Sequence, residues 1–239
     1  RCGAVGWAGR GLCGYTASDV AVHVSPYTWR LHDGWFGGFS GIELSEDGRE
    51  MVAISDRGMF VTGTLQREGG AVLGVQNVEA FRVLDTKGNF PKKAGLRDSE
   101  GLVLQTNGQL VVSFEGKHRL NRFAQPGAKA QGMPWRKELN RMKLNGGFEA
   151  LAINNWGKIF AIPEQPLGDE SVAQVFTLKK GQWEKAFILP RAKQFQPVGA
   201  DFGPDGRLYV LERGFNGLGF RARVRSFTVE GNTVSDEKL

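Results

Sequence analysis

The feature that most limits what this chain can fold into is a unit that occurs four times. In each copy a short apolar segment leads to a turn glycine, and a second apolar segment then leads to a carboxylate residue. The turn glycines are spaced by 60, 49 and 49 residues, at Gly48, Gly108, Gly157 and Gly206. Each follows a small residue by seven positions, and these small residues are Gly41, Gly101, Ala150 and Gly199. A period of about 40–50 residues with strand-like content is typical of a β-propeller.

The local pattern within each copy agrees with this interpretation. Three copies have two alternating apolar runs around an Asp-Gly or Asn-Gly pair, which is typical of a β-hairpin. Third strands are predicted over 59–66, 118–125, 173–180 and 221–230, and fourth strands over 80–84 and 184–190. Four strands per unit make a propeller blade. Helical signals are weak, and the best, over 134–142, predicts a turn or a short helix.

We therefore predict an all-β chain that forms a β-propeller of four-stranded blades. Residues 25–239 would form one domain with repeats near 38–85, 97–135, 147–190 and 196–239, after an irregular N-terminal tail over 1–24. A β-sandwich also has alternating strands, but the constant spacing of 49 residues favours the propeller. The blade number stays open, because the four repeats could form a complete small ring or part of a five- or six-bladed ring.

Composition limits the class of protein and its partners. The chain has 239 residues, a formal net charge of +6 and no apolar run of about 18 residues, so we expect no membrane span. Its basic residues are scattered without a nucleic-acid-binding motif, so we expect anionic small molecules rather than nucleic acid as partners. Cys2 and Cys13 form either a small disulfide or two free thiols. We expect a monomer.

The carboxylates of the repeats are predicted to converge. In a blade the second strand runs antiparallel to the innermost one, so the start of the first and the end of the second lie at one rim. The second strands end at Asp56, Glu115, Glu164 and Glu212, and the first strands begin beside Ser40, Glu100, Glu149 and Val198. Carboxylates this close raise one another's pKa or bind a cation, and hard oxygen ligands suit Ca²⁺. A calcium site is therefore predicted, with ion pairs that join blades as the alternative.

Basic residues stand next to these acids in the sequence. They are Arg57, Arg97, Lys117, Arg119 and Arg213. A phosphate group can bind between such cations and a metal ion. Other chemistries fit less well. A nucleophile elbow needs a glycine two residues after its serine, but Ile42 stands two residues after Ser40. No phosphate-binding glycine-rich loop precedes a predicted helix.

Four phrases of the sequence together resemble a known family. They are GGFSGIELSEDG with AISDRG, DSEGLVL with VSFEG, GFEALAI with AIPE, and PVGADFGPDGRLYVLERG. They are similar to the phytase-like propeller proteins described as having esterase-like activity of phytase, over about residues 27–230. The resemblance implies a β-propeller in an exported bacterial protein, periplasmic or secreted. It also implies a hydrolase in which acids hold Ca²⁺ and basic residues bind phosphate.

Carried over residue by residue, the resemblance implies roles for the repeated acids and their neighbours. Glu100 and Glu149 would be catalytic, Asp56, Glu115, Glu164 and Glu212 would bind the metal, and Arg57, Arg97, Lys117, Arg119 and Arg213 would bind the substrate. Two departures from the family pattern concern Ser40 and Val198, which stand where the middle repeats have Glu, and a further acidic repeat, which this chain lacks.

The sequence therefore predicts a Ca²⁺-dependent hydrolase of phosphate esters. Two alternatives stay open at this point. One is a non-catalytic propeller that binds an anion or a protein at the same rim. The other is a Ca²⁺-dependent lactonase or esterase.

Overall fold

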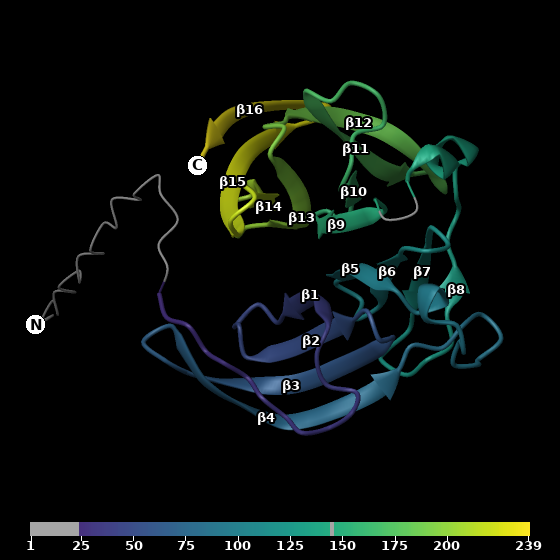
Figure 1. Ribbon diagram of the computed structural model, residues 1–239, viewed down its shortest axis with the longest axis vertical. Coiled ribbons are helices and arrows are strands. Elements are labelled where there is room, and N and C mark those ends of the chain that lie inside the picture. Colours follow the sequence, from purple (N-terminus) through teal and green to yellow (C-terminus); the bar gives the residue numbers. More distant parts are fainter. Residues whose placement is uncertain (1–23, 144–145) are drawn as a thin grey trace, which may run out of the picture.

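A computed structural model describes residues 24–143 and 146–239 of the chain (Figure 1). The predictions for the N-terminal tail, and for Cys2 and Cys13 within it, concern residues that lie outside this range. Among the described residues, no helix is long and apolar enough to cross a membrane.

The described chain forms four four-stranded antiparallel sheets, arranged as a four-bladed β-propeller. In every sheet the strands lie in the order in which they occur along the chain. The bounds of the strands, blade by blade, are β1 (Phe39–Leu44), β2 (Glu50–Ser55), β3 (Met59–Glu68) and β4 (Ala71–Arg82); β5 (Ser99–Leu104), β6 (Leu110–Phe114), β7 (Arg119–Phe123) and β8 (Gln131–Gly132); β9 (Phe148–Ile153), β10 (Ile159–Pro163), β11 (Val172–Lys179) and β12 (Gln182–Pro190); and β13 (Phe195–Phe202), β14 (Leu208–Phe215), β15 (Phe220–Glu230) and β16 (Thr233–Lys238). The propeller prediction is confirmed, and each blade matches one of the four sequence repeats.

In the part of the chain that the structure describes, helical structure is limited to two short 3-10 turns. They are η1 (Ala94–Leu96) and η2 (Lys137–Arg141), both in connections between blades. The second lies within the segment 134–142, for which a turn or a short helix was expected.

The repeated glycines have two different roles. Gly108 has a φ of 80° in the hairpin between β5 and β6, where a side chain would strain the backbone. Gly101 allows close approach of two blades, because a Cβ atom there would lie 2.8 Å from the Leu151 side chain and 2.9 Å from the Glu149 carbonyl oxygen. Small residues at the start of the inner strands therefore let these strands pack tightly around the channel.

Apolar clusters join neighbouring blades in sequence order. One cluster joins blades 1 and 2, a second joins blades 2 and 3, and a third joins blades 3 and 4. A fourth cluster belongs to blade 1 and the segment before it, where Trp29 and Trp35 pack on Met51, Val61 and Leu65. Among the described residues, no cluster of this kind joins blade 4 to blade 1.

Blades 1 and 4 consequently face each other across a hollow rather than a packed interface. A cavity of about 570 Å³ is lined by β1 on one side and by residues 198–201 of β13 on the other. The burial of the second strands shows the same difference. All residues of β6 and β10 are buried, whereas buried and exposed residues alternate along β14. One face of blade 4 is therefore open.

The inner strands β1, β5, β9 and β13 surround the channel (Figure 1). Their first residues and the last residues of β2, β6, β10 and β14 lie at the same end of the molecule, as the antiparallel registers require. We call this end the mouth rim.

Candidate functional site

Hydrogen bonds between blades fix the positions of the mouth strands. The Ser99 hydroxyl donates to the Ser55 carbonyl oxygen at 2.6 Å and links blade 2 to blade 1. The Ser113 hydroxyl donates to the Phe148 carbonyl oxygen at 2.5 Å and links blade 2 to blade 3. Ser99 directly precedes Glu100 and Phe148 directly precedes Glu149, so the backbone beside each glutamate is tied to a neighbouring blade.

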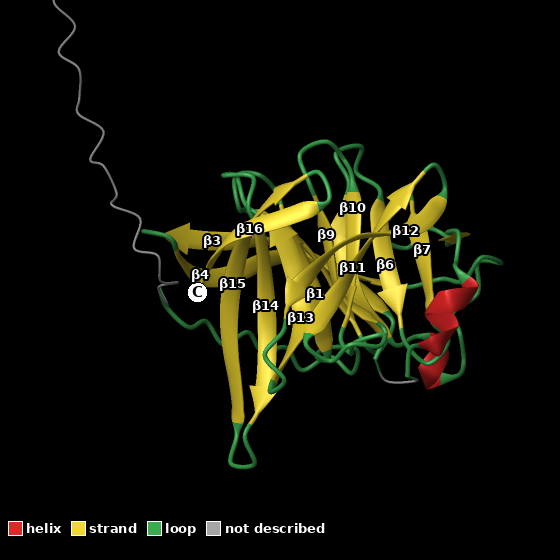
Figure 2. Ribbon diagram, turned by 90° about the horizontal axis from the view of Figure 1, so that it is seen from above, coloured by secondary structure: helices red, strands yellow, loops and turns green. Residues whose placement is uncertain are grey.

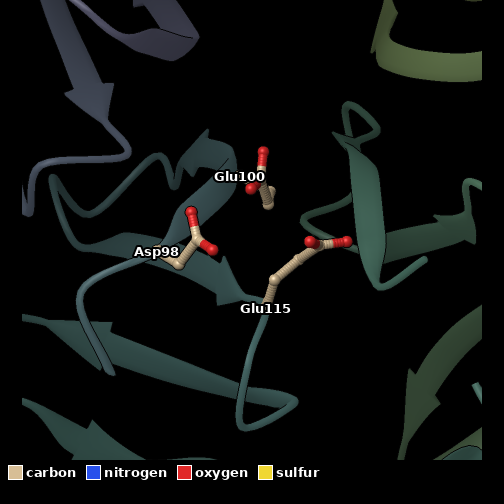
Figure 3. A group of neighbouring side chains, drawn as sticks. All are labelled: Asp98, Glu100 and Glu115. Atoms are coloured by element: carbon tan, nitrogen blue, oxygen red, sulfur yellow. The ribbon is translucent and has the colours of Figure 1, made fainter. Parts of the chain in front are cut away.

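Three carboxylates from blade 2 meet at the mouth rim. Asp98, Glu100 and Glu115 each offer one oxygen atom, and these atoms lie within 4.8 Å of one another (Figure 3). Asp98 and Glu100 come from the start of β5, and Glu115 follows the end of β6. An all-carboxylate donor set of this size fits a hard cation such as Ca²⁺, which takes oxygen ligands.

Two neighbouring glutamates from blade 3 extend the acidic group. Burial, and then the charges of Glu149, Asp98 and Glu115, raise the pKa of Glu100 from 4.5 to about 8. Burial and the charge of Glu164 raise the pKa of Glu149 from 4.5 to about 7, against a smaller lowering effect of Arg213. Burial also raises the pKa values of Asp98 and Glu164. The mouth therefore holds carboxyl groups that bind protons near neutral pH unless a cation compensates for their charge.

Glu115 and Glu164 are buried, and each has a different partner. A Glu115 carboxylate oxygen accepts a hydrogen bond from the Gly147 N–H at 2.9 Å, which orders the connection before β9. Glu164 has one guanidinium within ion-pair distance, that of Arg213, at 3.6 Å. Arg213 is half exposed, so this pair stays open toward solvent.

Glu212 was expected to end the second strand of the fourth repeat, but β14 continues to Phe215, and Glu212 pairs with Pro197 within it as Pro163 pairs with Phe148 in blade 3. Arg213 therefore stands where Glu164 stands in its repeat, and Glu212 has different surroundings. It is 2% exposed, and its two oxygens receive hydrogen bonds from Arg225 at 2.6 and 3.0 Å and from Arg223 at 2.6 Å. Arg225 also binds Glu237 at 3.0 Å. Two guanidinium groups thus neutralise Glu212 inside blade 4, and the carboxylate is not part of the group around Glu100.

Asp56, from the first repeat, lies at the edge of the acidic group. It is exposed, and it lines a hollow of about 720 Å³ together with Asp98, Arg57 and Arg97. Its negative charge contributes to the raised pKa of Asp98. Asp56 is therefore close enough to act on the site, although it lies outside the group of three.

The five predicted substrate-binding residues have distinct positions. The Arg57 guanidinium is hydrogen-bonded to the backbone, because it donates to the carbonyl oxygens of Gly34 and Phe36 at 3.3 and 2.7 Å. Arg213 pairs with Glu164. None of the ion pairs found among the described residues involves Arg97, Lys117 or Arg119. Arg97 and Lys117 are therefore available to an anion, whereas Arg119, like Arg57, donates to two carbonyl oxygens, those of Lys117 at 2.9 Å and Leu96 at 2.6 Å.

Aromatic rings and backbone carbonyls hold two of these cations in place. The Arg119 guanidinium lies over the Phe114 ring at 3.9 Å and donates to the Leu96 carbonyl oxygen at 2.6 Å, and burial lowers its pKa to about 10. The Arg97 guanidinium lies 5.0 Å from the centre of the Phe90 ring. Arg97 directly precedes Asp98, so a cation and the acidic group are adjacent.

Sequence reasoning missed three acids that the structure places in or near the channel. Asp98 belongs to the group of three, and its position two residues before Glu100 was the available signal. Glu43 and Asp201 occupy one repeated position further along β1 and β13, where blades 2 and 3 have Val103 and Ala152. Burial and the charge of Asp201 raise the pKa of Glu43 to about 8.

Solved structures are similar to this chain at low identity and with TM-scores below 0.5. Virginiamycin B lyase from Staphylococcus aureus is 11% identical with a TM-score of 0.47, and the alignment covers 84% of this chain and 58% of the lyase. A protein assigned as a gluconolactonase is 16% identical with a TM-score of 0.47, over 86% of this chain and 76% of that one. A protein of unknown function from Dyadobacter fermentans is 13% identical with a TM-score of 0.46, over 83% and 63%. This chain thus spans less than two thirds of the lyase.

The comparison by sequence gives a family. No curated protein matches the chain. A family model described as "Phytase-like: Esterase-like activity of phytase" matches residues 34–238, which is nearly the whole described propeller. This match supports a hydrolase-type, esterase-like propeller. The chain belongs to the phytase-like family of esterase-like propellers.

Proposed function

We propose that the protein is a Ca²⁺-dependent hydrolase of small phosphate esters, with its active site at the mouth rim. The observation that carries this proposal is the group of three carboxylates, together with a cation, Arg97, that lines a hollow with one of them, Asp98. Asp98, Glu100 and Glu115 place three carboxylate oxygens within 4.8 Å of one another, and Arg97 lies beside them without a carboxylate partner among the described residues.

Most of the acidic residues at the mouth rim would bind the metal ion. Asp98, Glu100 and Glu115 would hold Ca²⁺, with Asp56 and Glu164 at its edges. When bound, Ca²⁺ would neutralise the carboxylates and withdraw electrons from a phosphoryl oxygen. Glu212 has no role in this proposal, because Arg223 and Arg225 already occupy its oxygens.

The basic residues would bind the substrate. Arg97, Lys117 and Arg119 would bind the phosphoryl oxygens through charge-assisted hydrogen bonds, which are stronger than neutral ones. Phe90 and Phe114 already hold the two guanidinium groups, so less rotamer freedom is lost when the anion binds. Arg57 and Arg213 would support the site through the partners they already have.

Glu149 is the residue best suited to move a proton. Its pKa of about 7 leaves a large share of the carboxylate ionised at neutral pH, which suits a general base. Water would add to phosphorus while the Glu149 carboxylate takes a proton from it, and the ester P–O bond would break. The same carboxyl group would then return the proton to the departing alkoxide.

The family resemblance supports further parts of the proposal that concern the whole protein. We infer an exported bacterial protein that acts as a monomer on a small anionic substrate. Fractionation of the native host and measurement of the molar mass in solution would test these two points.

The reaction is tested by release of inorganic phosphate from an aryl phosphate. Turnover should require Ca²⁺, stop with a chelator, and fall about 100-fold in Glu149→Gln. Glu184→Gln, an exposed change on β12, is the matched control and should keep full activity. Thermal stabilisation by Ca²⁺ and phosphate without any turnover would replace the hydrolase proposal with a binding propeller. Turnover of a lactone, with none of the phosphate ester, would replace it with a lactonase.

A further inference from the structure

The hairpin between β14 and β15 ends in an exposed apolar tip. Phe215, Leu218 and Phe220 are 58%, 97% and 75% exposed. The two phenylalanine rings contact each other with their centres 5.2 Å apart, so they form one apolar cluster at the base of the turn that carries Leu218. Apolar side chains gathered on a protruding element indicate an interaction surface more strongly than scattered ones do.

The tip is an ordered turn. The Asn216 side-chain oxygen accepts hydrogen bonds from the N–H groups of Leu218 and Gly219 at 3.1 and 3.0 Å. Gly217 supplies a φ of 88°, and Phe215 pairs with Phe220 in the sheet register. These contacts fix the turn so that Leu218 points away from the protein, and little backbone freedom is lost when the tip binds a partner.

The tip stands on the rim that carries the candidate site. Figure 2 shows that this hairpin reaches beyond the other loops at its end of the molecule. Because β14 runs from the far end of the channel toward Glu212, the hairpin that follows it projects from the mouth rim. Among the connections that the structure describes, a flat surface approaching this rim would therefore meet the tip first.

Exposed cations surround the tip and continue along the same rim. The Arg213 guanidinium lies 5.9 Å from the Phe220 ring, and Arg221 directly follows Phe220 with its guanidinium 5.6 Å from the Phe195 ring. Exposed basic side chains occupy six connections or strand ends at this rim, at Arg57, Lys93, Lys117, Lys143, Lys193 and Arg221. Exposed acids of the rim, such as Asp56 and Asp169, belong to blades 1 and 3.

We propose that the mouth rim docks on a bilayer that contains anionic lipids, with the tip formed by Phe215, Leu218 and Phe220 inserted at the level of the headgroups. Phenylalanine and leucine partition into this layer, and basic residues beside them are attracted to anionic headgroups. The acidic group lies at the centre of the rim, but the exposed residues beside the tip, Arg213 and Arg221, are basic. They favour anionic lipid over a second copy of this chain, whose tip has the same basic neighbours. Docking in this way would turn the mouth toward the lipid surface. This proposal does not depend on which reaction the mouth performs.

The test is cosedimentation of the whole protein with vesicles. Wild-type protein should bind vesicles of phosphatidylcholine with phosphatidylglycerol, and bind those of phosphatidylcholine alone far more weakly. Leu218→Ser should reduce the partition coefficient about tenfold, since it removes a side chain that would be buried in lipid. Arg221→Gln should reduce it about fivefold, and this loss should disappear at high salt.

Two controls use the opposite rim. Trp156 is 87% exposed in the hairpin between β9 and β10, so Trp156→Ser removes a comparable apolar side chain from the wrong end. Lys179→Gln, at the hairpin between β11 and β12, removes a positive charge from the same opposite rim. Both should leave vesicle binding unchanged, and all four variants should keep the wild-type melting temperature.

Three outcomes would overturn the proposal. One is no binding of the folded wild-type protein to the anionic vesicles. Another is equal loss in Leu218→Ser and Trp156→Ser. The third is a concentration-dependent dimer that Leu218→Ser dissociates while vesicle binding stays the same, because that result assigns the tip to a second copy.

Discussion

Glu115 and Glu212 are the acids of two copies of one repeat, yet their surroundings are opposite. Both are buried, but Glu115 follows the end of β6, whereas Glu212 lies within β14, at the position that Phe114 has in β6. Glu115 lies among Asp98 and Glu100 and accepts one backbone N–H, whereas Glu212 is held by Arg223 and Arg225. A shift of one residue along the strand moves a side chain to the other face of the sheet, and this shift decides whether the charge is neutralised within the protein or is left for a ligand.

From this difference between Glu115 and Glu212, we expect the largest loss of stability for a substitution at Glu212. Glu212→Gln removes the charge that compensates Arg225, which is almost fully buried, so the free energy of unfolding should fall by roughly 3–5 kcal/mol. Urea denaturation with a fixed m-value measures the change. A loss below that of an exposed ion pair would show that Glu212 and Arg225 are not coupled as the geometry indicates.

Glu115→Gln should instead affect activity and leave stability nearly intact. The amide oxygen can still accept the Gly147 N–H, and one negative charge leaves a crowded site. Phosphate release should fall about 100-fold, while the melting temperature without Ca²⁺ should not drop. The pKa of Glu100 should also fall, because Glu115 is one of the charges that raise it; carboxyl chemical shifts followed by NMR measure this.

The acidic group should make stability depend on pH in an unusual direction. Glu100 and Glu149 bind protons more tightly in the folded state, with pKa values of about 8 and 7 against 4.5 in the unfolded chain. The folded state then holds more protons between these values, so without Ca²⁺ the free energy of unfolding should fall as pH rises from about 4.5 through about 8. Added Ca²⁺ should stabilise the protein more at pH 8 than at pH 5. Chemical denaturation across this range, with Ca²⁺ and with chelator, measures both slopes.

The smallest effect is expected at the outer partner of Arg225. Glu237→Gln removes a carboxylate 3.0 Å from the same guanidinium, but that carboxylate is 44% exposed. Solvent screens the pair, so the free energy of unfolding should fall by about 0.5–1 kcal/mol. Glu212 and Glu237 share Arg225, and Glu212 also binds Arg223, so the difference between their two variants measures what burial and the second guanidinium together add to an ion pair.

Much of the fold could be predicted from the sequence because the repeat is visible there. The 49-residue spacing and the small residue before each hairpin indicated the blades and their inner strands. The openness of blade 4 could not be predicted, because Tyr209 and Leu211 are apolar like their counterparts in buried strands, and only the three-dimensional arrangement shows that this face is uncovered.

The candidate site was predictable only in part. Convergence of Glu100, Glu115, Glu149 and Glu164 follows from the antiparallel order of the strands. The pairing of Glu212 depends on register, since Arg223 lies directly opposite it on β15 and Arg225 lies two residues further on. The alternating arginines at 221, 223 and 225 were the signal for this pairing, but their distance from Glu212 along the chain hides it.

The row of three interblade clusters also has a consequence for local unfolding. Blades 2 and 3 each have a packed neighbour on both sides, while blades 1 and 4 have one, so stability should be distributed as in a linear array of repeats. Backbone amides of blade 4 should then exchange with solvent before those of blade 3. Asp98, Glu100 and Glu115 come from blade 2, and Glu149 and Glu164 from blade 3. The two blades that carry the acidic group are thus the last to open, and the end blades can fluctuate without disturbing it.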